Sequence, residues 1–174
     1  MFLCGESFWT EAARQAFDFM ELSRNLKVES VSRLHPTAAI CLGRGQTVGE
    51  AVAVMREQRV GCVLVCEAGL VVGLFTERDL LRRVLAVGLS LDTPIERCMT
   101  ADPVAVEPGA PIDEAVLGME EGGYRHLPVV DDSGRPLGVL SVKRIVHYLV
   151  EHFPSTIYCL PPDPNVFPRQ REGA

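Results

Sequence analysis

An internal repeat restricts the fold of this chain more than any other feature. Residues 47–55 and 111–119 carry apolar side chains at the same places, spaced i, i+3, i+4 and i+7 as on one face of a helix. Thr47 and Glu50 predict a capping box at the start of the first helix. Pro111 suits the first turn of the second helix, because that position needs no N–H group. The chain is therefore expected to contain two similar units.

Each repeated helix is followed by two apolar runs with a glycine-bearing turn between them. The runs cover 61–66 and 70–75 in the first copy, and 126–130 and 136–140 in the second copy. Short β-rich runs joined by such a turn predict an antiparallel hairpin in each copy.

A second helix is expected after each hairpin, starting at Thr76 and at Ser141, and a short strand is expected before each first helix, at 39–42 and 103–106. Each unit then has the order β-α-β-β-α. Because one unit alone would have a small core, we expect two units packed as a pseudo-twofold pair of the α+β class. The apolar positions of the second helices are Leu80, Leu81, Val84 and Leu85 in one copy, and Ile145, Val146, Leu149 and Val150 in the other.

The charge and hydropathy of the chain limit its partners. Seventeen Lys and Arg against 23 Asp and Glu give the 174-residue chain a net charge of −6. An acidic chain is poorly suited to bind the phosphates of nucleic acid. Charged residues interrupt the long apolar runs and also occur throughout residues 1–20, so neither a membrane span nor a secretory signal is predicted. We expect a cytoplasmic protein with no nucleic-acid partner and no membrane partner.

The cysteines and histidines do not form a recognisable reactive site. The six cysteines show no CxxC pair and no histidine at zinc-ligand spacing, so no metal site is predicted. Cys62 and Cys66 lie in an apolar run, where free buried thiols are the simplest interpretation. No Gly-x-Ser-x-Gly motif or P-loop occurs, so we expect no catalysis. A hydrolase that uses a free thiol and a scattered histidine stays an open alternative.

Three segments resemble the tandem CBS domains known as the Bateman module. They are 73–80 at the junction of the first hairpin and the following helix, 98–104 at the start of the second unit, and 124–131. The similarity covers residues 31–153, and the chain resembles a stand-alone, bacterial-type member of the family. It implies an adenine nucleotide as a regulatory ligand in the cleft between the units, with no required cofactor. It also implies a homodimer and a regulated protein that the sequence does not identify.

Thr76 and Asp79 have two compatible interpretations. Their spacing predicts a capping box, in which Asp79 faces the positive end of the helix dipole. The resemblance to the family pattern Gly-x-x-Thr-x-x-Asp implies that Asp79 also accepts hydrogen bonds from the ribose hydroxyls of a nucleotide, while Thr76 approaches the ribose and phosphate. A carboxylate suits a cis-diol because it offers two acceptor oxygens.

The second copy departs from this pattern. Ser141 keeps the hydroxyl, but Arg144 stands where the carboxylate is expected. An arginine has only hydrogen-bond donors and cannot receive a ribose O–H. Lys143 and Arg144 are instead expected to bind a phosphate that reaches across from the first site. We predict one competent nucleoside site per chain.

The remaining candidates follow from the resemblance. Arg125 and His126 lie where the family often places phosphate contacts, although a solvated arginine and a structural histidine fit equally well. Arg78, Arg82 and Arg83 form either a solvated helix face or a phosphate-binding surface. The resemblance places Ile40, Cys41, Val60, Gly61 and Cys62 around adenine. The candidate ligand-binding residues are Ile40, Gly61, Cys62, Thr76, Arg78, Asp79, Arg125, His126, Ser141, Lys143 and Arg144, with no catalytic residue and no metal ligand among them.

Four segments are predicted along the chain. They are a helical N-terminal extension over 1–30, CBS units over 31–92 and 93–154, and an extended proline-rich tail over 155–174. The tail is not expected to form a helix from Pro154 onward. One face of the N-terminal helix, which should pack on the core or on a dimer partner, carries Trp9, Ala13, Phe17 and Met20.

The leading functional interpretation is a non-catalytic regulatory module. It binds an adenine nucleotide such as AMP, ADP or ATP and signals its presence to an unknown partner. The alternative is a structural dimerisation or scaffold module whose cleft stays empty.

Overall fold

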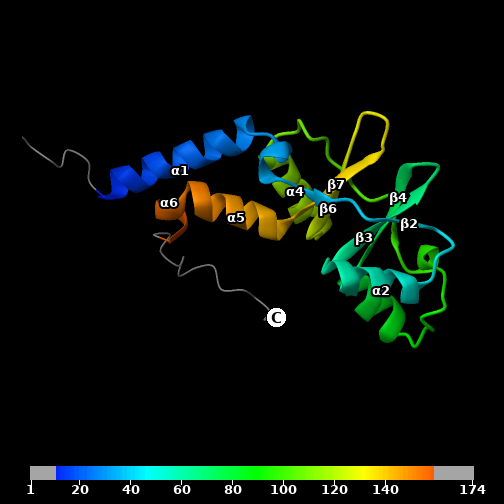
Figure 1. The fold of residues 1–174 in the computed structure, drawn as a ribbon. Helices are drawn as coiled ribbons and strands as arrows, with labels where there is room; N and C mark the ends of the chain where they lie inside the picture. Colours follow the sequence, from blue (N-terminus) through cyan, green and yellow to red (C-terminus); the bar gives the residue numbers. More distant parts are fainter. Residues whose placement is uncertain (1–10, 159–174) are drawn as a thin grey trace, which may run out of the picture.

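The computed structural model describes residues 11–158, and these residues form two α+β units preceded by a long helix (Figure 1). The first unit contains β2 (Cys41–Gly43), α2 (Val48–Gln58), β3 (Cys62–Glu67), β4 (Leu70–Thr76), α3 (Glu77–Asp79) and the π-helical turn η2 (Leu80–Leu85). The second unit contains α4 (Ile112–Gly122), β6 (His126–Val130), β7 (Pro136–Ser141) and α5 (Val142–His152). The other elements are α1 (Glu11–Val28), η1 (Val31–Leu34), β1 (Thr37–Ala38), η3 (Ile95–Arg97), β5 (Thr100–Ala101) and α6 (Pro154–Tyr158).

The predicted α+β repeat is confirmed, and both hairpins and the repeated helices α2 and α4 lie where the repeat places them. The β3–β4 and β6–β7 pairs are antiparallel, and β2 adds to β3 in parallel. Thr47 and Glu50 form the predicted capping box at the start of α2. Pro111 is the residue immediately before α4. Local patterns in the sequence therefore determine these elements.

The two units exchange short edge strands. β1 precedes the first unit in the sequence but pairs with β7 of the second unit. β5 precedes the second unit but pairs with β4 of the first unit. The equivalent glycines Gly73 and Gly138 permit this close approach. A Cβ on Gly138 would lie 2.9 Å from the carbonyl oxygen of Thr37, and a Cβ on Gly73 would collide with the side chain of Met99.

Because of this exchange, the segments that begin at the predicted boundaries, residues 31 and 93, pack in the core of the other unit. Val31 and Leu34 lie in the core of the second unit. Ile95, Cys98 and Met99 lie in the core of the first unit. Each unit thus completes its core with a segment that precedes the other unit in the chain.

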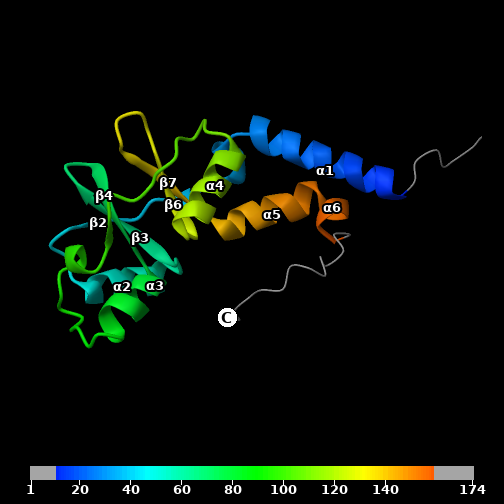
Figure 2. The ribbon, with the colours of Figure 1, turned by 180° about the vertical axis from the view of Figure 1, so that it is seen from behind.

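The two sheets face each other through a small apolar interface. One face of the first sheet packs on α2 and η2, which lie together on that side of the sheet (Figure 2). The opposite face of the first sheet contacts the second unit, and the buried residues of this contact are Cys62, Leu64, Leu74 and Val139. Cys62 and Leu64 alternate along β3 with Val63 and Val65, which point into the core of the first unit.

Four predicted features differ from the structure. The helix expected from Thr76 is a single α-helical turn that continues as a π-helix, closed by the bond from Ala86 N–H to the Leu81 carbonyl (2.9 Å). Of the four apolar positions predicted for this helix, Val84 is fully buried, whereas Leu81 is 61% exposed and Leu85 is 55% exposed. The strand expected at 103–106 is reduced to one bridge between Val106 and Val129.

The other two differences concern the ends. Pro154 begins the short helix α6, against the expectation that no helix forms there, because proline is tolerated in the first turn of a helix. The rest of the predicted tail lies outside the described residues. The N-terminal helix runs to Val28 and places Leu26 against the second core, whereas Met20 is 67% exposed. The side chains of Trp9, Ala13 and Phe17 lie outside the described structure. No helix within 11–158 is long and apolar enough to cross a membrane.

Candidate functional site

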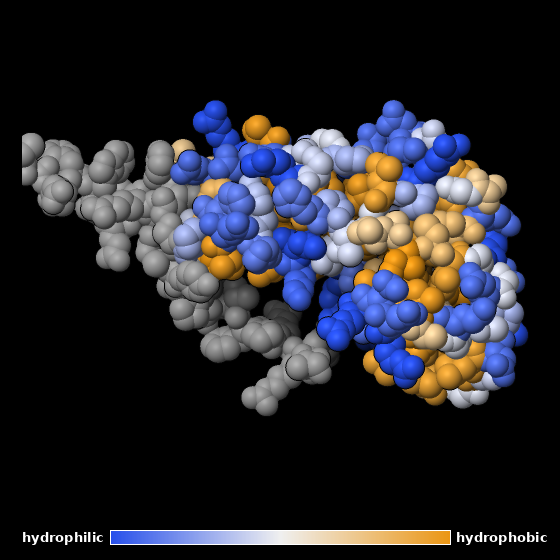
Figure 3. Space-filling view, viewed as in Figure 1, coloured by the Kyte–Doolittle hydropathy of each residue, from blue (hydrophilic) through white to orange (hydrophobic). Residues whose placement is uncertain are grey.

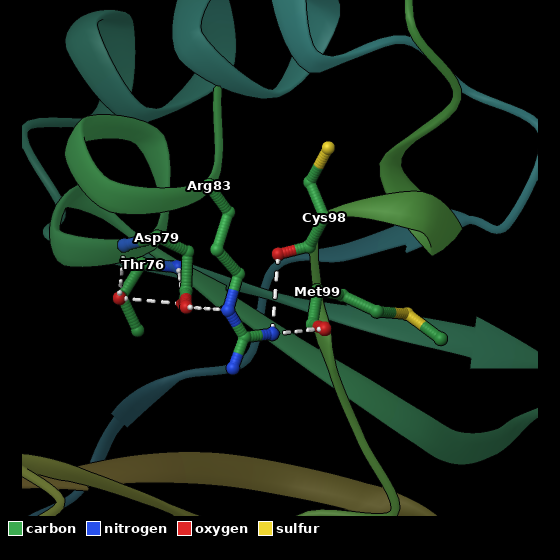
Figure 4. A network of polar contacts seen from close by, with 5 residues as sticks. All are labelled: Thr76, Asp79, Arg83, Cys98 and Met99. Carbon is green, nitrogen blue, oxygen red and sulfur yellow. Dashed lines mark hydrogen bonds and ion pairs between the residues drawn. The ribbon is translucent and has the colours of Figure 1, made fainter. Parts of the chain in front are cut away.

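Thr76 and Asp79 form a reciprocal hydrogen-bonded pair at the start of α3 (Figure 4). The Asp79 Oδ2 atom accepts hydrogen bonds from the Thr76 backbone N–H (3.0 Å) and from the Thr76 hydroxyl (2.7 Å). The Asp79 N–H donates in turn to the Thr76 hydroxyl oxygen (3.2 Å). The predicted capping box is therefore confirmed, and it holds an aspartate whose side chain is only 12% exposed.

Arg83 engages the other oxygen of the same carboxylate. Its Nε lies 3.3 Å from Asp79 Oδ1, one helical turn further along the chain. Its Nη1 donates to the carbonyl oxygens of Met99 (2.5 Å) and Cys98 (3.4 Å). Figure 4 shows the guanidinium lying between the carboxylate and these two carbonyls. Asp79 is thus connected through one side chain to the segment that leads into β5.

Four further residues meet beside this pair, at the contact between the units. Glu77 N–H donates to the Gly61 carbonyl (3.1 Å), which ties the start of α3 to the start of β3. A Cβ on Gly61 would lie 3.6 Å both from Glu77 Oε2 and from the imidazole of His126. Cys62 follows Gly61 and is the register partner of Thr76. The structure therefore brings Gly61, Cys62, Thr76 and His126 to one place, and their binding of a ligand stays a prediction.

The electrostatics of this place follow from burial. Burial lowers the pKa of His126, and the adjacent Arg125 lowers it further, while the carboxylate of Glu77 opposes both effects. Burial, with a smaller contribution from Glu77, raises the pKa of the Cys62 thiol to about 12. Cys62 is accordingly a protonated, unreactive thiol at neutral pH.

The equivalent position in the second unit is built differently. Ser141 precedes α5 and is the register partner of His126, but its side chain makes no capping bond. Arg144 and Lys143 are exposed on the first turn of α5. Within residues 11–158 no hydrogen bond or ion pair joins either of them to the Thr76–Asp79 pair. Their predicted contact with a phosphate stays a prediction.

Three further predicted residues, Arg78, Ile40 and Arg125, make hydrogen bonds elsewhere in the two units. Arg78 donates from Nη1 to the Gly123 carbonyl (3.2 Å) and so links α3 to the end of α4 across the two units. The Ile40 carbonyl accepts from Leu64 N–H (2.8 Å) at the edge of the first sheet. The Arg125 carbonyl accepts from Val142 N–H (3.0 Å), and its side chain is exposed.

The described cysteines are free, but they are not all buried as predicted. Cys62 and Cys98 are buried, Cys66 is half-buried and Cys41 is exposed, because Cys41 lies on the edge strand β2. Burial, together with a hydrogen bond to Cys41, raises the pKa of Cys66 to about 12. Among residues 11–158 no group of three or more His, Cys, Asp or Glu side chains is placed to hold a metal ion.

Two surface cavities lie away from the Thr76–Asp79 pair. One, of about 250 Å³, is bounded by α1, α5 and α6. The other, of about 420 Å³, lies beside α4. The place where Gly61, Glu77 and His126 meet borders neither of these two cavities.

Sequence reasoning missed two contributors to the site. The sequence interpretation groups Arg83 with Arg78 and Arg82 as a solvated helix face or a phosphate-binding surface, although its position four residues after Asp79 is the spacing of a helical ion pair. Glu77 was not selected at all, and no sequence signal distinguishes it from other exposed glutamates at a helix start.

The fold and the site together define a tandem pair of similar units with one intact Thr/Asp pair. The sequence profile of the CBS domain matches residues 31–86 and 95–151, with one match for each unit. The chain therefore belongs to the CBS domain family, which confirms the resemblance seen in the sequence.

Relatives from distant organisms share this region. An uncharacterized 17.7 kDa protein of Acidianus ambivalens is 30% identical over 122 residues, which cover 70% of this chain and 73% of that protein. The CBS domain-containing protein CBSCBSPB3 of Arabidopsis thaliana is 32% identical over 120 residues, 68% of this chain but only 21% of that protein. The solved structure of CBS domain protein PAE2072 from Pyrobaculum aerophilum, complexed with AMP, superposes with a TM-score of 0.63 at 26% identity and covers 71% of this chain and 99% of that one.

Proposed function

We propose that the chain is a non-catalytic regulatory module that binds one adenine nucleotide, AMP, ADP or ATP, between its two units. Occupancy of this site is passed to a partner protein, and no cofactor is required. The observation that carries the proposal is the Asp79 carboxylate at the start of α3, which is joined to the start of β3 by the Glu77–Gly61 hydrogen bond and by the pairing of Thr76 with Cys62. The AMP complex of the related PAE2072 supports the choice of ligand class.

The chemistry of the site suits a ribose in the first unit alone. The Asp79 carboxylate offers acceptors for the two hydroxyls of a cis-diol, and each charged hydrogen bond contributes about 1.5–3 kcal/mol net. The exposed cations Lys143 and Arg144 of the second unit supply donors for a phosphate but no acceptor for a ribose. One nucleoside site per chain is therefore proposed.

A panel of ligands tests this function. The melting temperature is measured with AMP, ADP, ATP, S-adenosylmethionine and NAD, on the wild-type chain and on Asp79→Ala. A ligand that binds only the folded state raises the melting temperature. We expect at least one adenosine compound to raise it in the wild-type chain, and the increase to be lost in Asp79→Ala.

A scaffold function is the second candidate, and one observation favours it. Both oxygens of Asp79 already have partners within the chain. A chain of this kind would need no ligand. The same panel separates the two functions, because a scaffold predicts no increase in melting temperature with any of the five compounds.

We also propose a homodimer. Equivalent turns of the two units expose apolar side chains, with Leu81 and Leu85 in η2 and Val146 in α5. Hydrophobic surface gathers over the first unit in Figure 3. A two-fold dimer would cover the same patch on both copies. Leu85→Lys should lower the mass measured by light scattering to that of a monomer, whereas Leu137→Lys, at an equally exposed leucine on the β6–β7 hairpin, should not.

A further inference from the structure

The side chain of Arg83 joins the proposed ribose acceptor to the connection between the units. One end of the guanidinium faces Asp79 Oδ1 at 3.3 Å. The other end donates to the carbonyls of Cys98 and Met99. Residues 98–102, here called the connecting segment, run from the core of the first unit through β5 toward the second unit.

The acceptor capacity of Asp79 determines what a bound ribose must displace. An ionised carboxylate has about four lone-pair positions, two on each oxygen. Oδ2 already accepts two hydrogen bonds from Thr76, and Oδ1 accepts from Arg83. One position is left, on Oδ1. A cis-diol that donates two hydrogen bonds therefore has to displace one of the present donors.

Arg83 is the donor that is easiest to displace. Its contact with Asp79 is the longest of the three, and its side chain is 48% exposed, so water can replace the carboxylate. Loss of the Thr76 bonds would instead open the helix start and leave a backbone N–H without a partner.

The connecting segment depends on Arg83 for part of its anchoring. The Met99 carbonyl is held by the guanidinium, and the Met99 side chain occupies the space that a Cβ on Gly73 would fill. Beyond it, Asp102 N–H donates to the Val72 carbonyl over 3.2 Å, and Asp102 adopts a left-handed backbone conformation with φ of 44°. Such a backbone conformation is unfavourable for a non-glycine residue, so the segment depends on its contacts.

Resting on the proposed nucleotide site, we infer that Arg83 is a positioning residue that couples the site to the connecting segment. A bound ribose displaces the Arg83 guanidinium from Asp79 Oδ1. Without its charged partner, the guanidinium holds the Cys98 and Met99 carbonyls less firmly, and the connecting segment becomes more mobile. The second unit has no such device. Tyr148 stands at the position equivalent to Arg83 and is buried in the core, and Arg144 replaces Asp79.

Hydrogen exchange of the wild-type chain with and without AMP tests the coupling directly. The amides of Met99 and Asp102, which donate to the carbonyls of Ile95 and Val72, should exchange several-fold faster with AMP bound. Exchange at Gly61 and Cys62 should not rise, because the ligand contacts that strand. Unchanged or slower exchange of the connecting segment in the AMP-bound chain would refute the coupling.

Two matched variants separate the coupling from the loss of a charge. Arg83→Met and Arg82→Met remove the same charge from the same turn and keep the aliphatic stem, but Arg82 is exposed and makes no described hydrogen bond or ion pair. Adenosine, which lacks a phosphate, should bind Arg83→Met about 2- to 5-fold more tightly than Arg82→Met, because the competing ion pair is gone. Amide hydrogen exchange in the connecting segment should already be fast in Arg83→Met, and AMP should not increase it further.

The outcomes distinguish the coupling from the site itself. Equal adenosine affinity in the two variants, with equal exchange of the connecting segment, would overturn the coupling while leaving the nucleotide site in place. Absence of AMP and adenosine binding to the wild-type chain and to both variants would overturn the nucleotide site, and the coupling with it.

Discussion

The same position differs in charge between the two units, and this difference separates their roles. In the first unit Asp79 is a nearly buried acceptor held by Thr76 and Arg83. In the second unit Arg144 is an exposed donor, and Ser141 makes no capping bond. The two units share an antiparallel hairpin and an exchanged edge strand. A duplicated fold can therefore keep its hairpins while only one copy keeps a carboxylate bonded to its own helix start.

The largest expected effect comes from removing the acceptor. Asp79→Ala should weaken AMP binding by about 30- to 1,000-fold, equivalent to about 2–4 kcal/mol, because the diol loses its charged acceptor. The free energy of unfolding should fall by only about 1 kcal/mol through the lost cap. Isothermal titration calorimetry and urea denaturation measure the two quantities. Arg144→Ala is the matched change in the second unit, and a loss of affinity as large as that of Asp79→Ala would contradict the asymmetry.

Restoring the acceptor in the second unit sharpens the comparison. Arg144→Asp places a carboxylate three residues after Ser141, which is the spacing of Thr76 and Asp79. If the swap of acceptor for donor accounts for the missing site, the stoichiometry of AMP in calorimetry should rise from one toward two per chain. A stoichiometry that stays at one would show that other features of the second unit prevent ribose binding.

The hydroxyls of Thr76 and Ser141, at the two helix starts, should contribute differently to the free energy of unfolding. Thr76→Ala should lower the free energy of unfolding by about 1 kcal/mol, because the Thr76 hydroxyl accepts from Asp79 N–H and donates to its carboxylate. Ser141→Ala should leave it almost unchanged, because the Ser141 hydroxyl makes no capping bond. Urea denaturation of both variants measures the difference, and equal losses would contradict it.

The smallest effect concerns pH. The pKa of His126 is lowered in the folded chain by burial, so the unfolded chain binds this proton more readily. The free energy of unfolding should therefore fall as the pH drops below about 6.5, the ordinary pKa of histidine, and His126→Gln should reduce this fall. His147→Gln, on the exposed side of α5, is the control. If the free energy of unfolding depended on pH identically in wild type and His126→Gln, the burial of His126 would not contribute to the loss of stability at low pH.

Much of the fold could be predicted because it depends on local patterns. The capping box at Thr47, the hairpins and the two long repeat helices follow from spacing and turn residues within each copy. The exchange of β1 and β5 could not be predicted, because edge pairing between units leaves no local period in two-residue strands. The π-turn after Asp79 was missed because its apolar residues also fit an ordinary helix.

The sequence predicts individual residues of the site, but it does not predict the tertiary contacts between them. Thr76 and Asp79 were identified because a capping pair and the family pattern coincide there. The contact of Arg83 with the carbonyls of Cys98 and Met99 is tertiary, so only its first half, the i,i+4 pairing with Asp79, is visible in the sequence. Likewise, His126 meets Gly61 and Glu77 only after the two units have packed.

A crystal structure of the chain grown with AMP tests the central claim most directly. The account predicts one nucleotide per chain, with its ribose hydroxyls on the Asp79 carboxylate and the Arg83 guanidinium turned away from that carboxylate. An empty contact between the units at saturating AMP, with Asp79 still bonded only to Thr76 and Arg83, would contradict it.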